Sequence, residues 1–155
     1  MNSIRTFVAA ALFACVAAHA AESGIDSPLL AWVGKYPSDA PTAHAGPLLQ
    51  QATLRKTLKM LLPKPEAALL AKFDSEALVR RVDDYLVIDK CRPHACPSDA
   101  AMIVIDLTSD RVWAGFFTRK STGVATRWYG NQDDWNALPP AIVTDFLNRH
   151  GSVAP

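Results

Sequence analysis

The chain has 155 residues, of which half are hydrophobic and a fifth are charged, and its formal net charge is +1. This balance is typical of one globular domain and argues against a disordered or fibrous chain. Because there is no basic surplus, neither nucleic acid nor an anionic membrane surface is expected as a partner.

The first 20 residues have the pattern of a secretory signal peptide. Arg5 supplies a positive start, and residues 7–18 form an apolar run that is too short to span a bilayer. Ala18 and Ala20 then place small residues at the two positions that signal peptidase inspects, so cleavage is expected after about Ala20. Lipidation at Cys15 and a buried first helix are the alternatives. No later apolar run approaches the ~20 residues of a membrane helix, so no membrane span is expected.

Removing this signal peptide leaves a neutral chain with two cysteines. Loss of Arg5 lowers the Lys plus Arg count of 16 by one, so that it equals the Asp plus Glu count of 15. Loss of Cys15 leaves Cys91 and Cys96. An even number of cysteines in an exported chain is typical of a disulfide bond.

Helices are predicted for the first half of the mature chain. Residues 21–47 form a lead-in with one short helix that begins at Pro28. Residues 48–62 have helical spacing, with an apolar face and a cationic face, and Pro63 ends this helix. The cationic face consists of Arg55, Lys56 and Lys59 and is expected to be solvated. Residues 65–73 form a second helix.

A meander of strands is predicted from Asp84 onward. Residues 85–88, 101–107, 112–118 and 124–129 are β-prone runs joined by short connections, which favour antiparallel hairpins. Residues 139–149 have helical spacing, and Gly151 ends that helix. The order predicts an α+β domain over residues 48–155, whose antiparallel sheet carries helices on one face. Three tryptophans of this part are expected in the core or at its rim, namely Trp113, Trp128 and Trp135. His44 and His150 are expected at the surface.

One short segment, Cys91-Arg92-Pro93-His94-Ala95-Cys96, carries residues that suggest a specific function. Pro93 and Ala95 favour a tight turn, which lets the two cysteine Cα atoms come within the ~4.4–6.8 Å that a disulfide requires. Closing so small a loop should contribute only about 2 kcal/mol to stability, so its main effect is to fix the shape of the loop. The loop should protrude from the end of a hairpin, and such a protrusion fits a concave site.

Other interpretations of this segment remain open. Zinc binding by Cys91, His94 and Cys96 would lack the usual fourth ligand. A redox dithiol would have a spacing different from the Cys-x-x-Cys of thioredoxin-like enzymes. The segment could also be the end of a hairpin that a disulfide closes, with a histidine that has no binding role. The sequence shows no Ser-His-Asp pattern, phosphate loop or supported carboxylate pair, so an enzyme is not expected.

The segment resembles the loop of the inhibitor of vertebrate lysozyme (Ivy) family, which reads Cys-x-Pro-His-x-Cys. The resemblance covers roughly residues 84–117 and includes the strand on each side of the loop. It implies a periplasmic inhibitor of C-type lysozyme that needs no cofactor. The loop would enter the enzyme's cleft, and His94 would be the key contact with the two catalytic carboxylates. An imidazole carries a nitrogen on each side, so one ring could bridge two carboxyl groups.

Two further hypotheses come from the same residues. The chain could be a periplasmic immunity protein against a peptidoglycan-cleaving toxin, which would also be exported and stapled by a disulfide. It could instead be a metal-binding or thiol-redox protein that uses Cys91, His94 and Cys96. Replacement of His94 separates the first of these from a lysozyme inhibitor. A homodimer is compatible with the inhibitor.

Overall fold

The computed structural model of the chain describes residues 27–96, 98–109, 111–130 and 135–153. The expected signal peptide, the cleavage site after Ala20 and Cys15 lie outside these residues. Within them, no helix is both long enough and apolar enough to cross a membrane.

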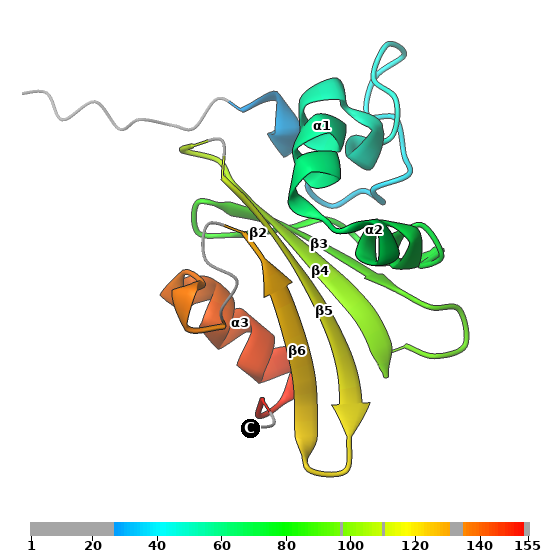
Figure 1. Cartoon of the computed structure of the whole chain (residues 1–155). Helices are drawn as coiled ribbons and strands as arrows, with labels where there is room; N and C mark the ends of the chain where they lie inside the picture. Colours follow the sequence, from blue (N-terminus) through cyan, green and yellow to red (C-terminus); the bar gives the residue numbers. More distant parts are fainter. Residues whose placement is uncertain (1–26, 97, 110, 131–134, 154–155) are drawn as a thin grey trace, which may run out of the picture.

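A six-stranded antiparallel sheet lies at the centre of the molecule (Figure 1). The strand order is β1-β3-β4-β5-β6, and β2 also pairs with β3. Consecutive strands from β3 onward are neighbours, which confirms the predicted meander. The sequence did not predict β1 and β2, which have only two and three residues. The bounds are β1 (Ser75–Glu76), β2 (Arg80–Val82), β3 (Tyr85–Cys91), β4 (Asp99–Asp106), β5 (Val112–Lys120) and β6 (Gly123–Tyr129).

The helices form close to the predicted places. The short helix of the N-terminal segment is the 3-10 helix η1 (Pro28–Trp32), and Ser27 caps it by accepting a hydrogen bond from the Leu29 amide. The predicted helix 48–62 is divided at Gln51, whose ψ of 130° is extended. It consists of η2 (Leu48–Gln50) and α1 (Ala52–Leu61). The remaining helices are α2 (Lys64–Leu70), η3 (Trp135–Ala137) and α3 (Pro140–His150).

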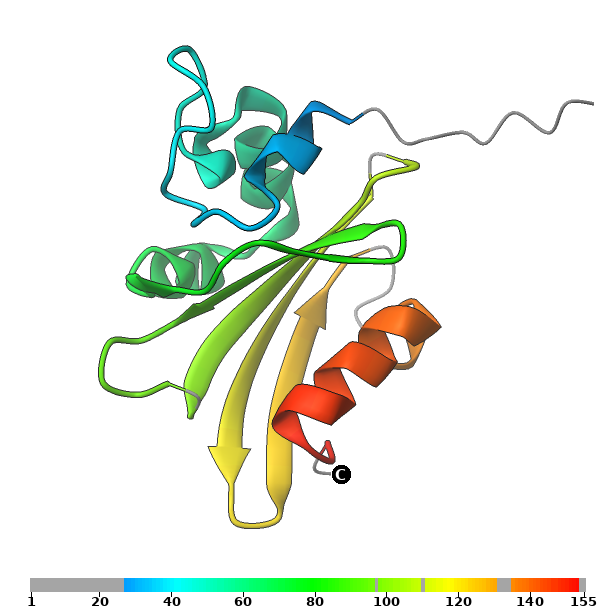
Figure 2. The same cartoon turned by 180° about the vertical axis from the view of Figure 1, so that it is seen from behind.

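Helices cover both faces of the sheet, so the expectation that they cover one face was wrong (Figures 1 and 2). Side chains alternate between the two faces of a strand. In β3, Leu86 and Ile88 belong to the core under α1 and α2, whereas Val87 belongs to the core under α3. The reason lies in β4, where every residue after Asp99 is buried. A strand that is apolar at successive positions requires cover on both sides.

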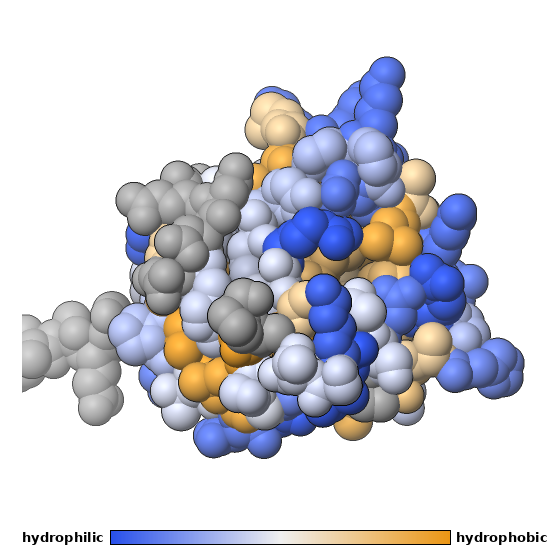
Figure 3. All heavy atoms as spheres, turned by 60° about the horizontal axis from the view of Figure 1, so that its bottom comes forward, coloured by the Kyte–Doolittle hydropathy of each residue, from blue (hydrophilic) through white to orange (hydrophobic). Residues whose placement is uncertain are grey.

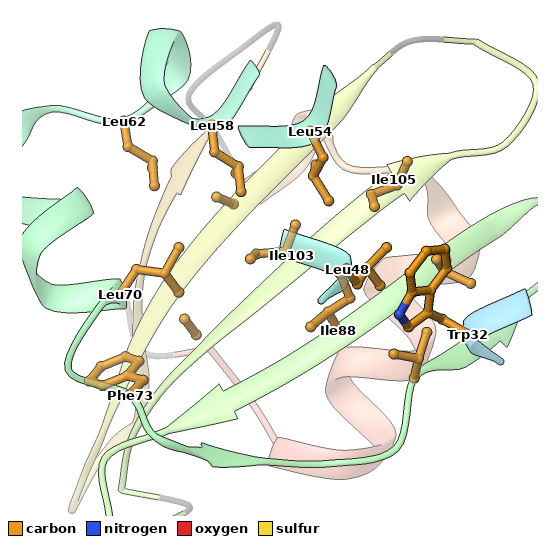
Figure 4. Packing of buried hydrophobic residues seen from close by; sticks show 14 of the residues in the cluster. Trp32, Leu48, Leu54, Leu58, Leu62, Leu70, Phe73, Ile88, Ile103 and Ile105 are labelled. Carbon is orange, nitrogen blue, oxygen red and sulfur yellow. The ribbon is translucent and has the colours of Figure 1, made fainter. Parts of the chain in front are cut away.

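The first core is mainly aliphatic (Figure 4). Leucines from α1 and α2 pack onto isoleucines of the central strands, and Trp32 and Leu48 join the same cluster. Residues from the expected lead-in therefore pack directly on the sheet. The cluster includes Leu54, Leu58, Leu62, Leu70, Phe73, Ile88, Ile103 and Ile105.

The second core is rich in aromatic rings. Phe146 of α3 is fully buried and makes edge contacts with Phe117 at 5.2 Å and Trp135 at 4.9 Å between ring centroids. Trp113 and Trp128 are buried and Trp135 is half-buried, as expected. The surface placement of His150 was wrong, because the residue is only 9% exposed and its ring packs against Phe117 and Phe146.

Candidate binding loop

The segment from Cys91 to Cys96, called the 91–96 loop, extends the hairpin of β3 and β4 beyond the sheet. It is the yellow-green connection at the lower right of Figure 1 and at the left of Figure 2. Cys91 and Cys96 form a disulfide with a Cα–Cα distance of 5.4 Å. Below it, the Arg92 amide donates to the Asp99 carbonyl at 3.0 Å, which closes the hairpin. The predicted protruding, disulfide-closed loop is therefore present.

The disulfide bears on the metal hypothesis. Because the two sulfur atoms are bonded to each other, neither is available as a thiolate ligand. Among the described residues, no group of three or more His, Cys, Asp or Glu side chains is arranged to hold a metal ion. Cys91, His94 and Cys96 thus do not form the proposed metal site in this structure.

A tight turn occupies the inside of the loop. The Ala95 amide donates to the Arg92 carbonyl at 3.0 Å, so Pro93 and His94 are the two central turn residues. His94 has a φ of +63°, in the left-handed region. Proline at the second position and a positive φ at the third are features of a type II turn. Histidine is among the non-glycine residues that tolerate this conformation best, although it is still uncommon.

His94 lies exposed at the tip of this turn, next to the exposed Pro93. Within the described residues, no hydrogen bond or ion pair holds its imidazole. Ala95, by contrast, is half-buried, and its amide and carbonyl are used inside the loop, with the carbonyl accepting from the amides of Ser98 and Asp99. The backbone of the loop is therefore fixed while the ring of His94 stays available to a partner.

Arg92 points toward the base of the loop, a direction that the sequence left open. Its guanidinium forms an ion pair with Asp99 at 2.7 Å. On the other side of the base, Lys90 forms an ion pair with Glu76 of β1 at 2.9 Å, and Cys91 lies opposite Ser75. Both sides of the loop are thus tied to neighbouring strands by ion pairs between side chains.

A second group of charges anchors α3 near the same end of β3. Arg80 of β2 contacts Asp89 at 3.0 Å and Asp145 of α3 at 2.7 Å, and Arg149 of α3 contacts Asp89 at 2.5 Å. Burial alone would lower the pKa of Arg80, but the hydrogen bond to Asp145 and the charge of Asp89 raise it. Burial and the charge of Arg149 lower the pKa of His150. Sequence reasoning missed this cluster.

Figure 3 turns the bottom of Figure 1 forward, which brings the ends of the strands near the loop into view. Hydrophilic side chains protrude around the edge of this surface, and separate hydrophobic patches lie between them. This surface is therefore polar at its rim.

Comparisons with known proteins extend this description. The family model described as "Inhibitor of vertebrate lysozyme (Ivy)" matches residues 53–151. The matched range begins in α1, includes the entire 91–96 loop and runs to the residue after α3. No curated protein and no solved structure gave a significant match to the chain.

Proposed function

Because the chain belongs to the inhibitor of vertebrate lysozyme (Ivy) family, whose members inhibit lysozyme and are not enzymes, we propose that the 91–96 loop is its inhibitory element. The loop would enter the active-site cleft of a C-type lysozyme. The observation that carries this proposal is the exposed His94 at the tip of a disulfide-closed turn, with its backbone fixed and its imidazole unpaired within the described residues.

The chemistry of such a contact follows from the enzyme's mechanism. Retaining glycosidases, of which lysozyme is the type case, hold two carboxyl groups about 5–5.5 Å apart. A protonated imidazole donates from both ring nitrogens, and hydrogen bonds between charged partners are stronger than neutral ones. His94 can therefore bridge the two carboxyl groups and occupy the place of the substrate.

The shape of the loop supports tight binding. A loop that is already fixed loses little conformational entropy when it binds, so more of its contact energy is kept as affinity. The Cys91–Cys96 disulfide, the Arg92 carbonyl and the Arg92–Asp99 ion pair all restrain it. Since the guanidinium of Arg92 is held at the base by Asp99, the imidazole of His94 is the exposed polar group at the tip of the loop that a partner would meet.

We also propose that the protein acts in the periplasm, where it would protect peptidoglycan from lysozyme. The signal-like pattern of the first 20 residues supports this location. The disulfide is in keeping with an oxidising compartment. Titration of free thiols in the isolated protein tests this part, and two reactive thiols would contradict it.

The decisive experiment measures lysis of bacterial cell walls by hen-type lysozyme in the presence of the mature protein, His94→Ala and His44→Ala. Both histidines are exposed, so neither substitution removes a buried contact, and urea denaturation of each variant measures the small loss of stability expected from alanine at the positive φ of position 94. We expect His94→Ala to raise the inhibition constant by roughly 30-fold or more, as for an interface hot spot. His44→Ala should inhibit like the natural chain.

Two outcomes would overturn this proposal. Equal inhibition by the natural chain and His94→Ala would show that the inhibitory contact lies elsewhere than at His94. If the natural chain and both variants all fail to inhibit, hen-type lysozyme is excluded as the target. That result would favour an immunity protein against a peptidoglycan-cleaving toxin.

A further inference from the structure

A concave surface lies on the face of the molecule that α1 and α2 cover. It is a groove of about 620 Å³ between the two helices, the segment around η2, and strands β1 and β3. This volume falls within the roughly 300–1,000 Å³ of small-molecule sites. The groove does not include any residue of the 91–96 loop.

The inner wall of the groove is apolar. Leu58 of α1, Leu62 directly after α1, and Leu70 of α2 line it and point toward one another across the space between the helices (Figure 4). Each of these side chains is less than 9% exposed, so they form a wall that is already packed from behind. A ligand that covered this wall would need an apolar part of its own.

The rim of the groove is cationic. Arg55 and Lys59 lie one turn apart on α1, Lys64 begins α2, and all three are exposed. In the described part of the chain, no carboxylate forms an ion pair with any of them. Lys90 also lines the groove, but Glu76 neutralises it at 2.9 Å. The unpaired charge around the groove is therefore positive.

This arrangement refines the interpretation of the cationic face of α1. Arg55, Lys56 and Lys59 are all exposed, as the sequence predicts for a solvated face. However, only Arg55 and Lys59 border the groove, and Lys56 does not. The positions of Arg55, Leu58, Lys59 and Leu62 follow helical spacing, so cations and leucines alternate along one side of α1.

We propose that this groove binds a free monoacyl anion, such as a medium- or long-chain fatty acid. The acyl chain would cover Leu58, Leu62 and Leu70, and the carboxylate would lie among Arg55, Lys59 and Lys64. Charge complementarity selects an anion over a neutral amphiphile, and the apolar wall selects an acyl chain over a small carboxylate. Because the cations are exposed, they contribute more to selectivity than to affinity.

The test is calorimetric titration of the mature protein with octanoate, decanoate and dodecanoate below their micellar concentrations, and with dodecyl maltoside as a neutral probe. Each methylene buried should tighten binding by up to about fourfold, because apolar burial favours binding by a nearly constant amount per group. Higher salt should weaken dodecanoate binding, since the cations are solvent-exposed. Dodecyl maltoside should bind more weakly than dodecanoate.

Matched variants locate the site. Ala67 and Ala68 are both exposed on α2, but only Ala67 lines the groove. Ala67→Glu should weaken dodecanoate binding at least tenfold, and Ala68→Glu should not. Lys59→Glu and Lys56→Glu form a second pair on α1, with the effect confined to Lys59→Glu. All four positions are solvent-exposed, so these substitutions should leave the fold intact.

Several outcomes would overturn this inference. One is the lack of dodecanoate binding. If the protein instead sediments with phosphatidylglycerol vesicles but does not bind dodecanoate, the ligand is a membrane surface and not a free acyl anion. Another is that both variants of a matched pair weaken dodecanoate binding equally. A third is that the protein binds dodecyl maltoside as tightly as dodecanoate. A dimer that forms without ligand and is lost in Ala67→Glu would identify a second copy of the chain as the occupant. None of these outcomes depends on lysozyme inhibition, which Ala67→Glu should retain.

Discussion

The 91–96 loop and the face of the sheet under α3 are stabilised in different ways. The loop is largely exposed and is held by one disulfide, local hydrogen bonds and an ion pair at its base. The α3 face depends on buried aromatic rings and on the charge cluster around Asp89. This difference teaches that most of the stability resides away from the proposed binding loop, so substitutions in the α3 face should lower stability and leave binding unchanged.

The largest expected effect on stability is that of Phe146→Ala. Phe146 is fully buried among Phe117, Trp128 and Trp135, and removal of such a ring leaves a cavity. The free energy of unfolding should fall by about 3–5 kcal/mol, measured by urea denaturation. Its exposed neighbour in α3 provides the control, because Leu147→Ala should lose far less. Weaker inhibition per folded molecule in Phe146→Ala would contradict the separation of binding from stability.

Removal of the disulfide should lower stability less than Phe146→Ala does and should weaken inhibition as well. In Cys91→Ser/Cys96→Ser, the free energy of unfolding should fall by only about 2 kcal/mol, because the bond closes a very short loop. Inhibition of lysozyme should weaken by about tenfold, because the loop and the positive φ of His94 must then be ordered during binding. Urea denaturation and an inhibition assay on the same sample measure both quantities. Unchanged inhibition would show that the disulfide contributes to stability but not to binding.

The sequence predicted much of the meander because strands β3 to β6 carry apolar runs separated by short turns. It missed β1 and β2 because two or three residues carry no periodicity, and their pairing with β3 depends on tertiary contacts. The cover on both faces was recognisable in principle. Residues 100–105 contain no polar side chain, which is typical of a strand that is buried on both sides.

The loop itself was predictable from its motif, but its internal geometry was not. The positive φ of His94 and the direction of Arg92 toward Asp99 result from closure of the hairpin, which depends on atoms outside the motif. The burial of His150 had a signal that was overlooked. Ile142, Phe146 and His150 follow one another at intervals of four, so they share one face of α3.

The two ends of β4 allow a further test of the comparison, because Asp99 lies beside the loop and Asp106 lies at the opposite end. Burial alone would raise the pKa of Asp106, but hydrogen bonds from Thr108 and Ser109 and contact with Arg111 lower it to about 2. The carboxylate is therefore favoured in the folded state. Its contribution of roughly 2 kcal/mol should be present above pH 3.8 and lost as pH falls toward 2.

Urea denaturation between pH 5 and pH 2.5 measures this contribution. In Asp106→Asn the corresponding part of the pH dependence should disappear, while inhibition at neutral pH should stay close to that of the natural chain because the loop is at the other end of β4. An unchanged acid slope in the variant would assign the acid sensitivity to other carboxylates.

The smallest expected effect concerns His150 on the α3 face. Burial and the charge of Arg149 lower its pKa from 6.5, against the opposing influence of Asp89 and Asp145. The unfolded chain therefore takes up a proton at higher pH than the folded chain, and stability should decrease as pH falls below 6.5. Above 6.5 both states hold a neutral ring, so the contribution is complete there.

Melting temperatures between pH 8 and pH 5 test this sign. His150→Phe should flatten the decrease, because phenylalanine keeps the contacts with Phe117 and Phe146 and takes up no proton. His94→Ala should keep the decrease, because the ring of His94 is exposed and unpaired within the described residues.

The two histidines are therefore expected to have different roles. Loss of His94 should alter inhibition at every pH, whereas loss of His150 should alter only the pH at which the fold weakens. A decrease that persists in His150→Phe and vanishes in His94→Ala would reverse this assignment.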